Sequence, residues 1–333
     1  MFVALADLQA LQGKDPERGI PRWIIQFIKS LKAAGIRIIG LENTTLPPVR
    51  KDIAEVCDLV GPNSREFVRT VVEGQRAVYV CPSPFEPIRP IRHLLPAHVV
   101  DAEIPIATVM FDLVLYLFPD FYQIRRGDQQ TYETRKRLFE SSDAFLCISH
   151  STAKDLASTW EVNNHQVHFV GTGIDDSFVP TELDPVFRER LGIRNKFVFC
   201  VGRADPRKQT AKLISSFASL SEEERRDLQL VITCRLDDET RLEWQRVASL
   251  SGLKDDEVVF TGLVSDAELK GLYSECELFV EPSLYEGFGF PVAEAAACGA
   301  VVVSSNTSSL PEILEFPDST FDPGSIDSIA AAI

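Results

Sequence analysis

The chain has 333 residues, of which 45% are hydrophobic and 25% charged, a composition typical of globular proteins that bury a sizeable core. Its 49 acidic and 34 basic residues give a formal net charge of −15, which argues against general nucleic-acid binding because phosphate neutralisation needs a basic face. No apolar run reaches the ~18 residues of a membrane span, and the N-terminal segment does not have the pattern of a signal peptide.

The first half of the chain alternates short β-rich runs with helical patterns. The segment Ile20–Gly35 places Trp23, Ile24 and Phe27 on one helical face, and Gly35 ends it. Two more helices are predicted, near Gln130–Ser141 and from Thr152. The predicted strands are Phe2–Asp7, Ile36–Leu41, Ala77–Val80, Ile104–Phe111, Ala144–Ser149 and Gln166–Gly171.

The second half repeats this alternation. Ser265 and Glu268 form a capping-box pattern that opens a helix, and the helix Phe290–Gly299 has Pro291 in its first turn. Further helices are predicted over Lys208–Leu220 and Leu242–Leu253. The predicted strands are Lys196–Gly202, Leu228–Cys234, Glu257–Gly262, Glu277–Ser283 and Ala300–Ser305.

Strands that alternate with helices predict an α/β fold with parallel sheets. The length suggests about two domains, and two such series predict two doubly wound, Rossmann-like domains. We expect an N-terminal domain over residues 1–176, a linker over 177–195 where periodicity lapses, and a C-terminal domain over 196–333. The last residues resemble an interrupted helix, so we expect the C-terminal domain to be truncated.

The seven cysteines are odd in number, widely spaced and without a C-x-x-C pair, which argues against a disulfide framework or a cysteine zinc site. We predict that they are small core residues in a reducing compartment. The five histidines include no H-x-x-x-H pair on a predicted helix, so no metal site is expected. Together these features predict a cytoplasmic protein.

Two loops of the second half follow strands, at the sheet edge where open α/β proteins bind ligands. Arg203 and Lys208 stand five residues apart between a strand and a helix, with Asp205 and Pro206 forcing a turn between them. Two cations beside a helix N-terminus make an anion site. A solvated loop with two ordinary surface cations is the alternative.

The second loop, Glu281–Gly289, has Gly287 and Gly289 on either side of Phe288, which lets the backbone approach a ligand. Glu286 lies in this loop, and Glu294 lies one turn into the following apolar helix. Carboxylates accept hydrogen bonds from sugar hydroxyls, and a carboxylate in so apolar a helix needs a partner. The alternative is a helix-capping Glu286 and a surface Glu294.

These two loops resemble the retaining glycosyltransferases of family 4, which have the GT-B architecture. The resemblance rests on VGRADPRK (from Val201), FTGLVSDAELKGLY, the pair Glu286 and Glu294 in EGFGFPVAE, and SSLPEI. In the first half it rests on DLQALQ, RGIPRW, FDLVLYLFPDFY, CISHSTAKDL and GTGID. It covers nearly the whole chain.

The resemblance implies that Arg203 and Lys208 bind the diphosphate of a nucleoside-diphosphate-sugar donor and stabilise its leaving charge. It implies that Glu294 holds the ribose hydroxyls. Transfer would need no metal or other cofactor, because the cations and the helix dipole neutralise the diphosphate. In agreement, Asp175-Asp176 and Asp237-Asp238 are interpreted as turn and cap residues, and no D-x-D motif is convincing.

The same resemblance implies a sugar and base site. The donor sugar and distal phosphate would be held by Glu286 and the backbone N–H groups of Phe288, Gly289 and Phe290, and the base would lie against Val264. Transfer would retain the anomeric configuration, with the acceptor attacking from the face that the phosphate leaves. The expected acceptor is a glycan or a lipid-linked glycan.

The first half departs from the family pattern at two positions. Phe111 stands where many relatives have a histidine that lines the sugar pocket, and Pro21 stands where relatives usually have a glycine. Asp112 is a candidate catalytic residue, with a loop-capping carboxylate as the alternative. Ser149 and Thr152 are interpreted as a helix cap rather than phosphate ligands.

A basic stretch formed by Arg125, Arg126, Arg135, Lys136 and Arg137 is interpreted as a solvated helix, with peripheral contact at the inner membrane face as the alternative. The first functional hypothesis is thus a retaining hexosyltransferase. The second is a GT-B module that binds nucleotide-sugar without transfer, within a larger glycan-assembly protein. A dehydrogenase is disfavoured because G-x-G-x-x-G is missing after the first strand.

Overall fold

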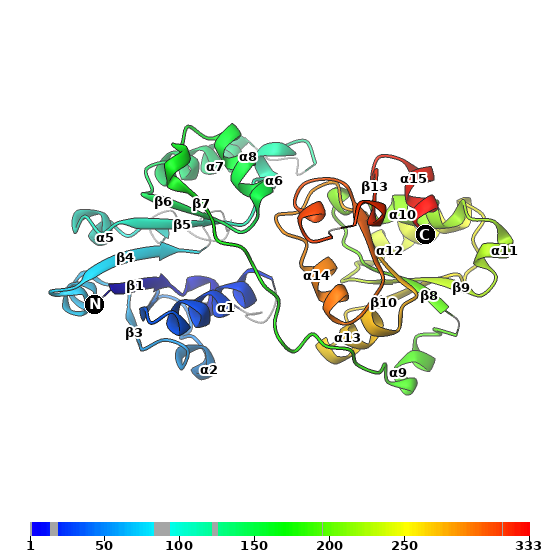
Figure 1. Ribbon diagram of the computed structural model, residues 1–333, viewed down its shortest axis with the longest axis horizontal. Coiled ribbons are helices and arrows are strands. Elements are labelled where there is room, and N and C mark those ends of the chain that lie inside the picture. The colour runs from blue at the N-terminus through cyan, green and yellow to red at the C-terminus, as the bar shows by residue number, and fades with distance from the viewer. Residues whose placement is uncertain (1, 14–18, 83–93, 122–125, 195, 315) are drawn as a thin grey trace. The chain divides into compact units, whose positions relative to one another are not determined.

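The computed structural model describes residues 2–13, 19–82, 94–121, 126–194, 196–314 and 316–333. The chain divides into two compact units, Met1–Gly173 and Ile174–Ile333. Figure 1 shows one set of parallel strands in the blue-to-green unit and another in the green-to-red unit. Each unit is an α/β structure, which confirms the predicted fold class.

The first unit is built on a sheet of seven parallel strands in the order β3-β2-β1-β4-β5-β6-β7. Its strands are β1 (Phe2–Asp7), β2 (Arg37–Glu42), β3 (Leu59–Pro62), β4 (Arg76–Cys81), β5 (Ile106–Met110), β6 (Ala144–Cys147) and β7 (Val167–Phe169). Its described helices are η1 (Gln9–Gln12), α1 (Ile20–Ala33), α2 (Lys51–Ala54), α3 (Arg65–Val72), α5 (Ala97–Asp101), α6 (Val114–Leu117), α7 (Arg126–Phe139), α8 (His150–Thr159) and η2 (Asn164–Gln166).

The second unit has six parallel strands in the order β10-β9-β8-β11-β12-β13. They are β8 (Lys196–Val201), β9 (Leu228–Thr233), β10 (Val258–Gly262), β11 (Leu278–Glu281), β12 (Val302–Ser305) and β13 (Thr320–Phe321). The helices are α9 (Pro185–Arg190), η3 (Pro206–Lys208), α10 (Thr210–Ala218), α11 (Glu222–Arg225), α12 (Asp238–Leu250), α13 (Asp266–Glu275), α14 (Phe290–Ala297), η4 (Leu310–Glu312), η5 (Pro317–Ser319) and α15 (Ile326–Ala332).

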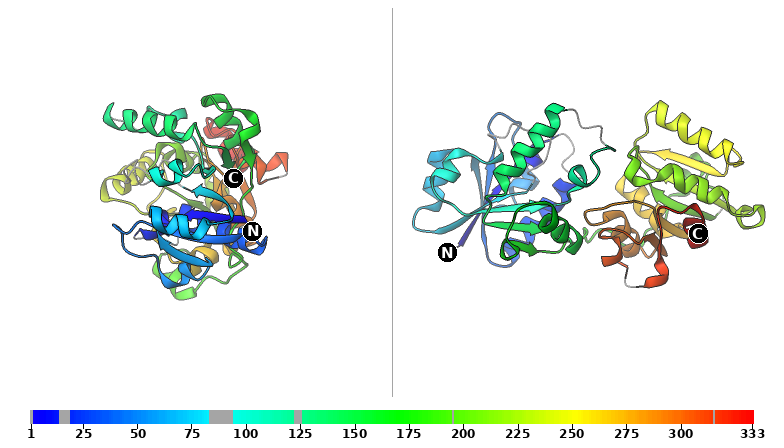
Figure 2. Two further views of the ribbon diagram at one scale, coloured as in Figure 1. Left: turned by 90° about the vertical axis from the view of Figure 1, so that its left-hand side faces the viewer. Right: turned by 90° about the horizontal axis from the view of Figure 1, so that it is seen from above.

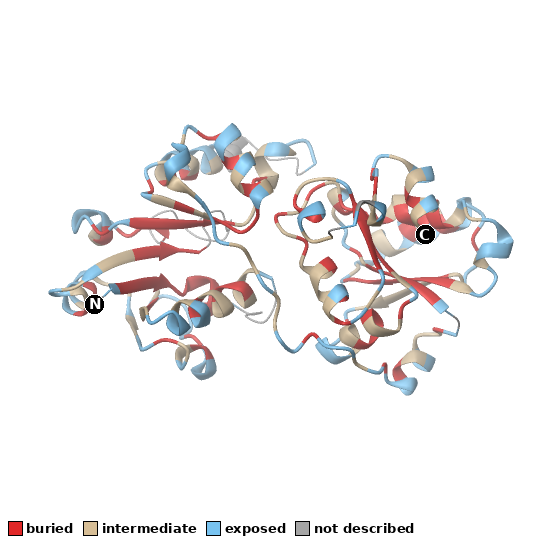
Figure 3. Ribbon diagram, in the orientation of Figure 1, coloured by how far each residue is buried: buried red, intermediate tan, exposed pale blue. Residues whose placement is uncertain are grey.

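Both faces of the second sheet are buried, as parallel sheets require. Successive residues of β8 point to opposite faces: Phe197 and Phe199 pack in one core cluster, whereas Val198 and Cys200 pack in the other. Helices flank the strands in Figure 2, and Figure 3 shows the strands buried and the outer turns of the helices exposed. All seven cysteines are buried free thiols, so the prediction that they are core residues is confirmed.

Short polar side chains start the helices where the sequence predicts them. The Ser265 side chain accepts a hydrogen bond from Glu268 N, and the Glu268 carboxylate accepts one from Ser265 N. Ser149 Oγ likewise accepts from Thr152 N at 3.0 Å, which confirms the cap interpretation of this pair. Asp237 caps α12 by accepting from Thr240 N at 2.8 Å.

The stretch expected to be a linker, 177–195, packs as part of the second unit. Phe178, Leu183 and Phe187 are buried in its core. Arg188 also donates to Glu275 Oε2 on α13 at 2.7 Å. The structure therefore changes units at Gly173 and Ile174 rather than after residue 176. The apolar anchors of this stretch are spaced without a helical or strand period, so the sequence pattern does not reveal them.

Candidate functional site

The two candidate loops of the second unit leave neighbouring strands at one edge of the sheet. Strands β8 and β11 pair directly, and the strand order reverses between them. Such a reversal is where open α/β sheets bind ligands, beyond the carboxyl ends of the strands. The loops also touch, since Leu284 N donates a hydrogen bond to Arg207 O at 2.8 Å.

Lys208 and Glu286, both predicted from the sequence, are in direct contact. Lys208 Nζ lies 2.9 Å from Glu286 Oε1 and 3.5 Å from both carboxylate oxygens of Glu281. Arg207 Nη1 lies 3.0 Å from Glu286 Oε2, and Arg207 Nη2 lies 3.4 Å from Asp205 Oδ2. All of these side chains are at most 13% exposed, so the charges form a largely buried network.

Burial and the neighbouring opposite charges shift the pKa values of this network in opposite directions. Burial by itself lowers the pKa of Lys208, but the Glu281 and Glu286 carboxylates outweigh it and hold that pKa above its usual range. Burial pushes the pKa of Glu286 upward, whereas Lys208 and Arg207 overcome it and keep that carboxyl pKa low. Burial also raises the pKa of Glu281, and here the opposing effect of Lys208 is too small to reverse it. Glu286 is therefore the firmly ionised carboxylate of the pair.

Arg203, the other predicted cation, differs from Lys208 in its exposure and its ion pairing. It is exposed, and within the described part of the chain its guanidinium forms no ion pair. Its backbone is fixed to the start of α10, because Thr210 Oγ1 lies 3.5 Å from both Arg203 N and Arg203 O. The sequence reasoning missed Arg207 and Glu281, which carry no spacing signal because one sits in a turn and the other ends a strand.

The start of α14 presents backbone donors. Gly289 precedes the helix with a φ of 110°, a conformation that side-chain-bearing residues rarely adopt. The N–H groups of Phe288, Gly289 and Phe290 make no hydrogen bond to any part of the chain that the structure describes. Such free amides at a helix N-terminus suit an anion or a sugar oxygen.

Glu294 has the partner that its apolar helix requires. It is half-buried on α14, and its Oε2 accepts a hydrogen bond from the Tyr273 hydroxyl at 3.1 Å. Tyr273 is fully buried on α13, and burial together with the Glu294 charge raises the pKa of its hydroxyl well above the usual range. Val264 is 8% exposed and packs in the same core cluster as Tyr273. The surface-residue alternative for Glu294 does not fit this contact.

Three hydroxyl residues after β12 fasten the loop that carries Glu286. Ser309 Oγ donates to Glu286 O at 2.9 Å and to Phe288 O at 2.7 Å. Ser308 Oγ accepts from Glu286 N at 2.8 Å, and Thr307 Oγ1 donates to Leu284 O at 2.9 Å. Ser308 has a φ of 51°, an uncommon backbone conformation for a serine that fits this role. The helix-capping alternative for Glu286 fails, since α14 has no side-chain cap.

The remaining predicted residues lie in the first unit. Asp112 Oδ1 accepts a hydrogen bond from Val114 N at 3.1 Å, so its carboxylate supports the start of α6. Phe111 packs its ring edge against Trp23 of α1, with ring centroids 5.0 Å apart. Pro21 sits in the first turn of α1, where a missing N–H costs no hydrogen bond.

The basic stretch differs from expectation at Arg135. This side chain is 1% exposed and faces inward, one helical turn before the fully buried Phe139. It therefore belongs neither to a solvated helix face nor to a membrane-facing patch. Lys136 lies 3.7 Å from Glu140, whereas Arg125 and the side chain of Arg126 lie outside the described residues.

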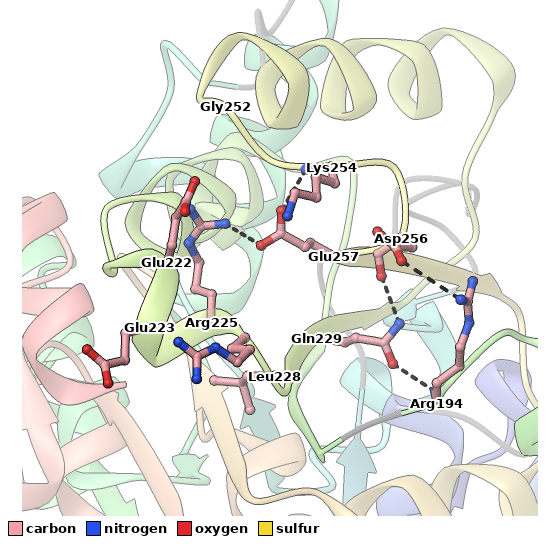
Figure 4. Close-up of a pocket in the computed structure, with 11 residues that line it drawn as sticks. Arg194, Glu222, Glu223, Arg225, Leu228, Gln229, Gly252, Lys254, Asp256 and Glu257 are labelled. Atoms are coloured by element: carbon pink, nitrogen blue, oxygen red, sulfur yellow. Dashed lines mark hydrogen bonds and ion pairs between the residues drawn. The ribbon is translucent and has the colours of Figure 1, made fainter.

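Two cavities flank the second sheet. One of about 460 Å³ lies at the carboxyl edge, and its lining includes Arg203, Asp205, Thr240 and Trp244. A larger one of about 620 Å³ lies near the amino ends of β8, β9 and β10, and Figure 4 shows Arg225 directed at Glu257 and Arg194 directed at Asp256. There Arg225 pairs with Glu257, and Arg194 Nη1 lies 3.9 Å from Asp256. The smaller cavity adjoins the candidate site, and the larger one does not.

Neither a metal-ligand cluster nor a membrane-spanning helix is found among the described residues. They contain no group of three or more His, Cys, Asp or Glu side chains placed to hold a metal ion. No helix among them is long and apolar enough to cross a bilayer.

Comparison with solved structures defines the class of fold. The protein resembles Anabaena Alr3699/HepE, solved in complex with UDP and glucose, with a TM-score of 0.70 over 99% of this chain and 88% of that one, at 16% identity. It also resembles a sucrose-phosphate synthase from Thermosynechococcus elongatus, with a TM-score of 0.69 over 99% and 88% of the two chains, at 19% identity. Together with its two parallel sheets, these likenesses show that the chain has the GT-B fold.

A family model matches most of the second unit. Residues 185–333 match the model of the family "Glycosyl transferases group 1", which agrees with the resemblance to glycosyltransferases found in the sequence.

Similar curated proteins include mannosyltransferases. The serotype-specific mannosyltransferase WbdA of Escherichia coli is 29% identical over 225 residues, 66% of this chain and 28% of the relative. The O-antigen chain mannosyltransferase B of E. coli is 26% identical over 232 residues, 68% and 59% of the two chains. The MMP alpha-(1->4)-mannosyltransferase of Mycolicibacterium hassiacum is 31% identical over 206 residues, 60% and 47%. The matches thus span between 28% and 59% of these relatives' lengths.

Proposed function

We propose that the protein is a retaining glycosyltransferase that moves a hexose from a nucleoside-diphosphate sugar to a glycan acceptor. One observation carries the proposal: the second unit gathers cations, free amides and two supported carboxylates at the switch point of its sheet. The family match over residues 185–333 supports the same reaction class. The names of the similar proteins favour mannose as the sugar.

The proposed roles follow from what each group offers. Lys208 and the exposed Arg203 meet the charge that develops on the diphosphate as its bond to the sugar breaks. The amides of Phe288, Gly289 and Phe290 face the distal phosphate and the sugar. These groups supply positive charge and donors themselves, so the proposal includes no resident metal ion and no other cofactor.

The carboxylates of Glu286 and Glu294 bind different parts of the donor. Glu286, held between Lys208 and Arg207, accepts hydrogen bonds from the sugar hydroxyls. Glu294, oriented by the Tyr273 hydroxyl, accepts from the ribose hydroxyls, and the base lies against Val264. The acceptor attacks from the face that the diphosphate leaves, so the configuration at the anomeric carbon is retained.

The test is calorimetric titration with UDP, GDP and ADP, each alone and linked to mannose or glucose, in the presence of a chelator. Wild type is compared with Glu294→Ala and with Glu277→Ala, a control that removes an exposed carboxylate. We expect one base to bind selectively, with binding lost in Glu294→Ala and kept in the control. No binding of any of these nucleotides to wild type would refute the donor site.

Transfer is tested separately, with the selected sugar nucleotide and mannose oligosaccharides as acceptors. The product's anomeric configuration, read by NMR, distinguishes retention from inversion. A second candidate, binding without transfer, is favoured by Phe111, whose ring packs on Trp23, because the resemblance to family 4 implies that many relatives have a histidine at this position. A large gain of transfer in Phe111→His with unchanged donor affinity would support that second candidate.

A further inference from the structure

Glu281 is a buried carboxylate to which the proposed reaction gives no role. It is the last residue of β11 and is 1% exposed. Ser283 Oγ donates a hydrogen bond to its Oε1 at 2.7 Å, and Lys208 Nζ lies 3.5 Å from both of its oxygens. Burying a charge is costly unless it is well paired, so its position beside Lys208 needs a reason.

The charges around Lys208 do not balance. Among the residues that the structure describes, the ion pairs of this network join two cations, Arg207 and Lys208, to the three carboxylates of Asp205, Glu281 and Glu286. With every carboxylate ionised its net charge is −1. The exposed Arg203 adds a cation at the edge of the loop but pairs with none of these carboxylates.

The other titratable groups that face Glu281 do not change the net charge of the network near neutral pH. Cys200 of β8 and Tyr273 of α13 lie close enough to interact with it. Burial raises the pKa of both groups well above the usual range, so both stay neutral. The excess negative charge therefore rests on the carboxylates, next to the cation that the donor needs.

The geometry indicates which carboxylate gives up its charge. Glu286 is held by two cations, Lys208 at 2.9 Å and Arg207 at 3.0 Å. Glu281 has one cation at the longer distance of 3.5 Å. An arriving diphosphate competes for Lys208, and Glu281 is the carboxylate that loses its counter-ion.

We propose that Glu281 is the resident counter-ion of Lys208 and takes up one proton from solvent when the donor's diphosphate binds beside that lysine. Glu281 is thus a positioning residue that acts through Lys208. It couples donor affinity to pH, because the diphosphate binds best when Glu281 is neutral. This inference rests on the proposed donor site.

The experiment measures proton uptake on binding. Inorganic pyrophosphate, UDP, GDP and ADP are titrated calorimetrically at pH 7.5 in buffers of different ionisation enthalpy. Wild type is compared with Glu281→Gln and with Glu277→Gln, which also removes one carboxylate but pairs with Lys196 at 3.1 Å, away from Lys208. Protonation of the ligand itself is common to all three proteins and cancels in the comparison.

We expect the wild type and Glu277→Gln to take up nearly one proton more per bound ligand than Glu281→Gln. Linkage of one proton makes wild-type affinity fall up to tenfold per pH unit relative to Glu281→Gln as the pH rises. Binding with equal uptake in wild type and Glu281→Gln overturns this inference and leaves the proposed function intact. No binding of any probe to wild type overturns both.

A second variant covers the case in which Glu281→Gln does not fold. Ser283→Ala removes the hydroxyl that stabilises ionised Glu281 at 2.7 Å. A carboxylate that loses this hydrogen bond has a higher pKa, so in Ser283→Ala the curve of proton uptake against pH shifts to higher pH. Uptake is therefore measured over a range of pH, and a profile that coincides with that of wild type overturns the inference.

Discussion

Replacing Lys208 by methionine tests the buried charge network in the most direct way. Lys208→Met keeps a long side chain but leaves Glu281 and Glu286 facing each other, at 1% and 13% side-chain exposure, with Arg207 as the remaining cation. Breaking a buried ion pair by removing one partner costs about 3–5 kcal/mol. In a unit of this size that lowers the midpoint of thermal unfolding by roughly 6–20 °C.

Arg203→Met is the matched control. It also removes one cation of the proposed diphosphate site, but from an exposed side chain, so the free energy of unfolding should change by no more than ~0.5 kcal/mol. Both variants should weaken nucleotide binding. The free energy of unfolding therefore distinguishes Lys208 from Arg203, although the sequence predicts the same role for both, binding of the donor diphosphate.

The assay follows the second unit alone. Trp244 is its single tryptophan, so urea unfolding is recorded by fluorescence in a Trp23→Phe/Trp160→Phe background. The double variant Lys208→Met/Glu281→Gln should recover more than half of the lost stability, because it returns the network to the net charge of −1 that it has in wild type. If Lys208→Met unfolds at the same urea concentration as Arg203→Met, the carboxylates do not depend on Lys208 and the reasoning fails.

Three further predictions concern neighbouring residues. Tyr273→Phe removes the hydrogen bond to Glu294, and urea unfolding should show a loss of about 1.5–3 kcal/mol that is absent in a Glu294→Ala background. Gly289→Ala places a methyl group 2.5 Å from Leu310 Cδ2 at a φ of 110°, so calorimetry should show a free energy of unfolding lower by about 2 kcal/mol or more, together with weaker nucleotide binding. The pKa of Glu281 is raised above 4.5 in the folded state, so its contribution to stability is full below that value and is lost as the pH rises through the folded pKa. Glu281→Gln has no group that titrates there, so the variant should gain stability relative to wild type as the pH rises from 4.5 through the folded pKa of Glu281, and a constant difference would contradict this.

The sequence predicts most of the fold because the signals are local. Periodicity and caps identify most strands of both sheets and helices such as the one opened by Ser265, and those features depend on residues a few positions apart. The short edge strands β3 and β13 were not predicted, because four and two residues are too few to show a period. The stretch 177–195 was interpreted as a linker for a similar reason, since its buried residues are spaced irregularly.

The sequence by itself determined where the candidate ligand site lies in the second unit. Loops that follow parallel strands meet at one edge, and the apolar helix around Glu294 already required a partner for that carboxylate. Only the tertiary structure decided which partners are used. Tyr273 reaches Glu294 from another helix, and Glu281 and Arg207 enclose the Lys208–Glu286 pair from a strand and a turn. Contacts between distant segments are set by packing, and packing also buried Lys208 while it left Arg203 in solvent.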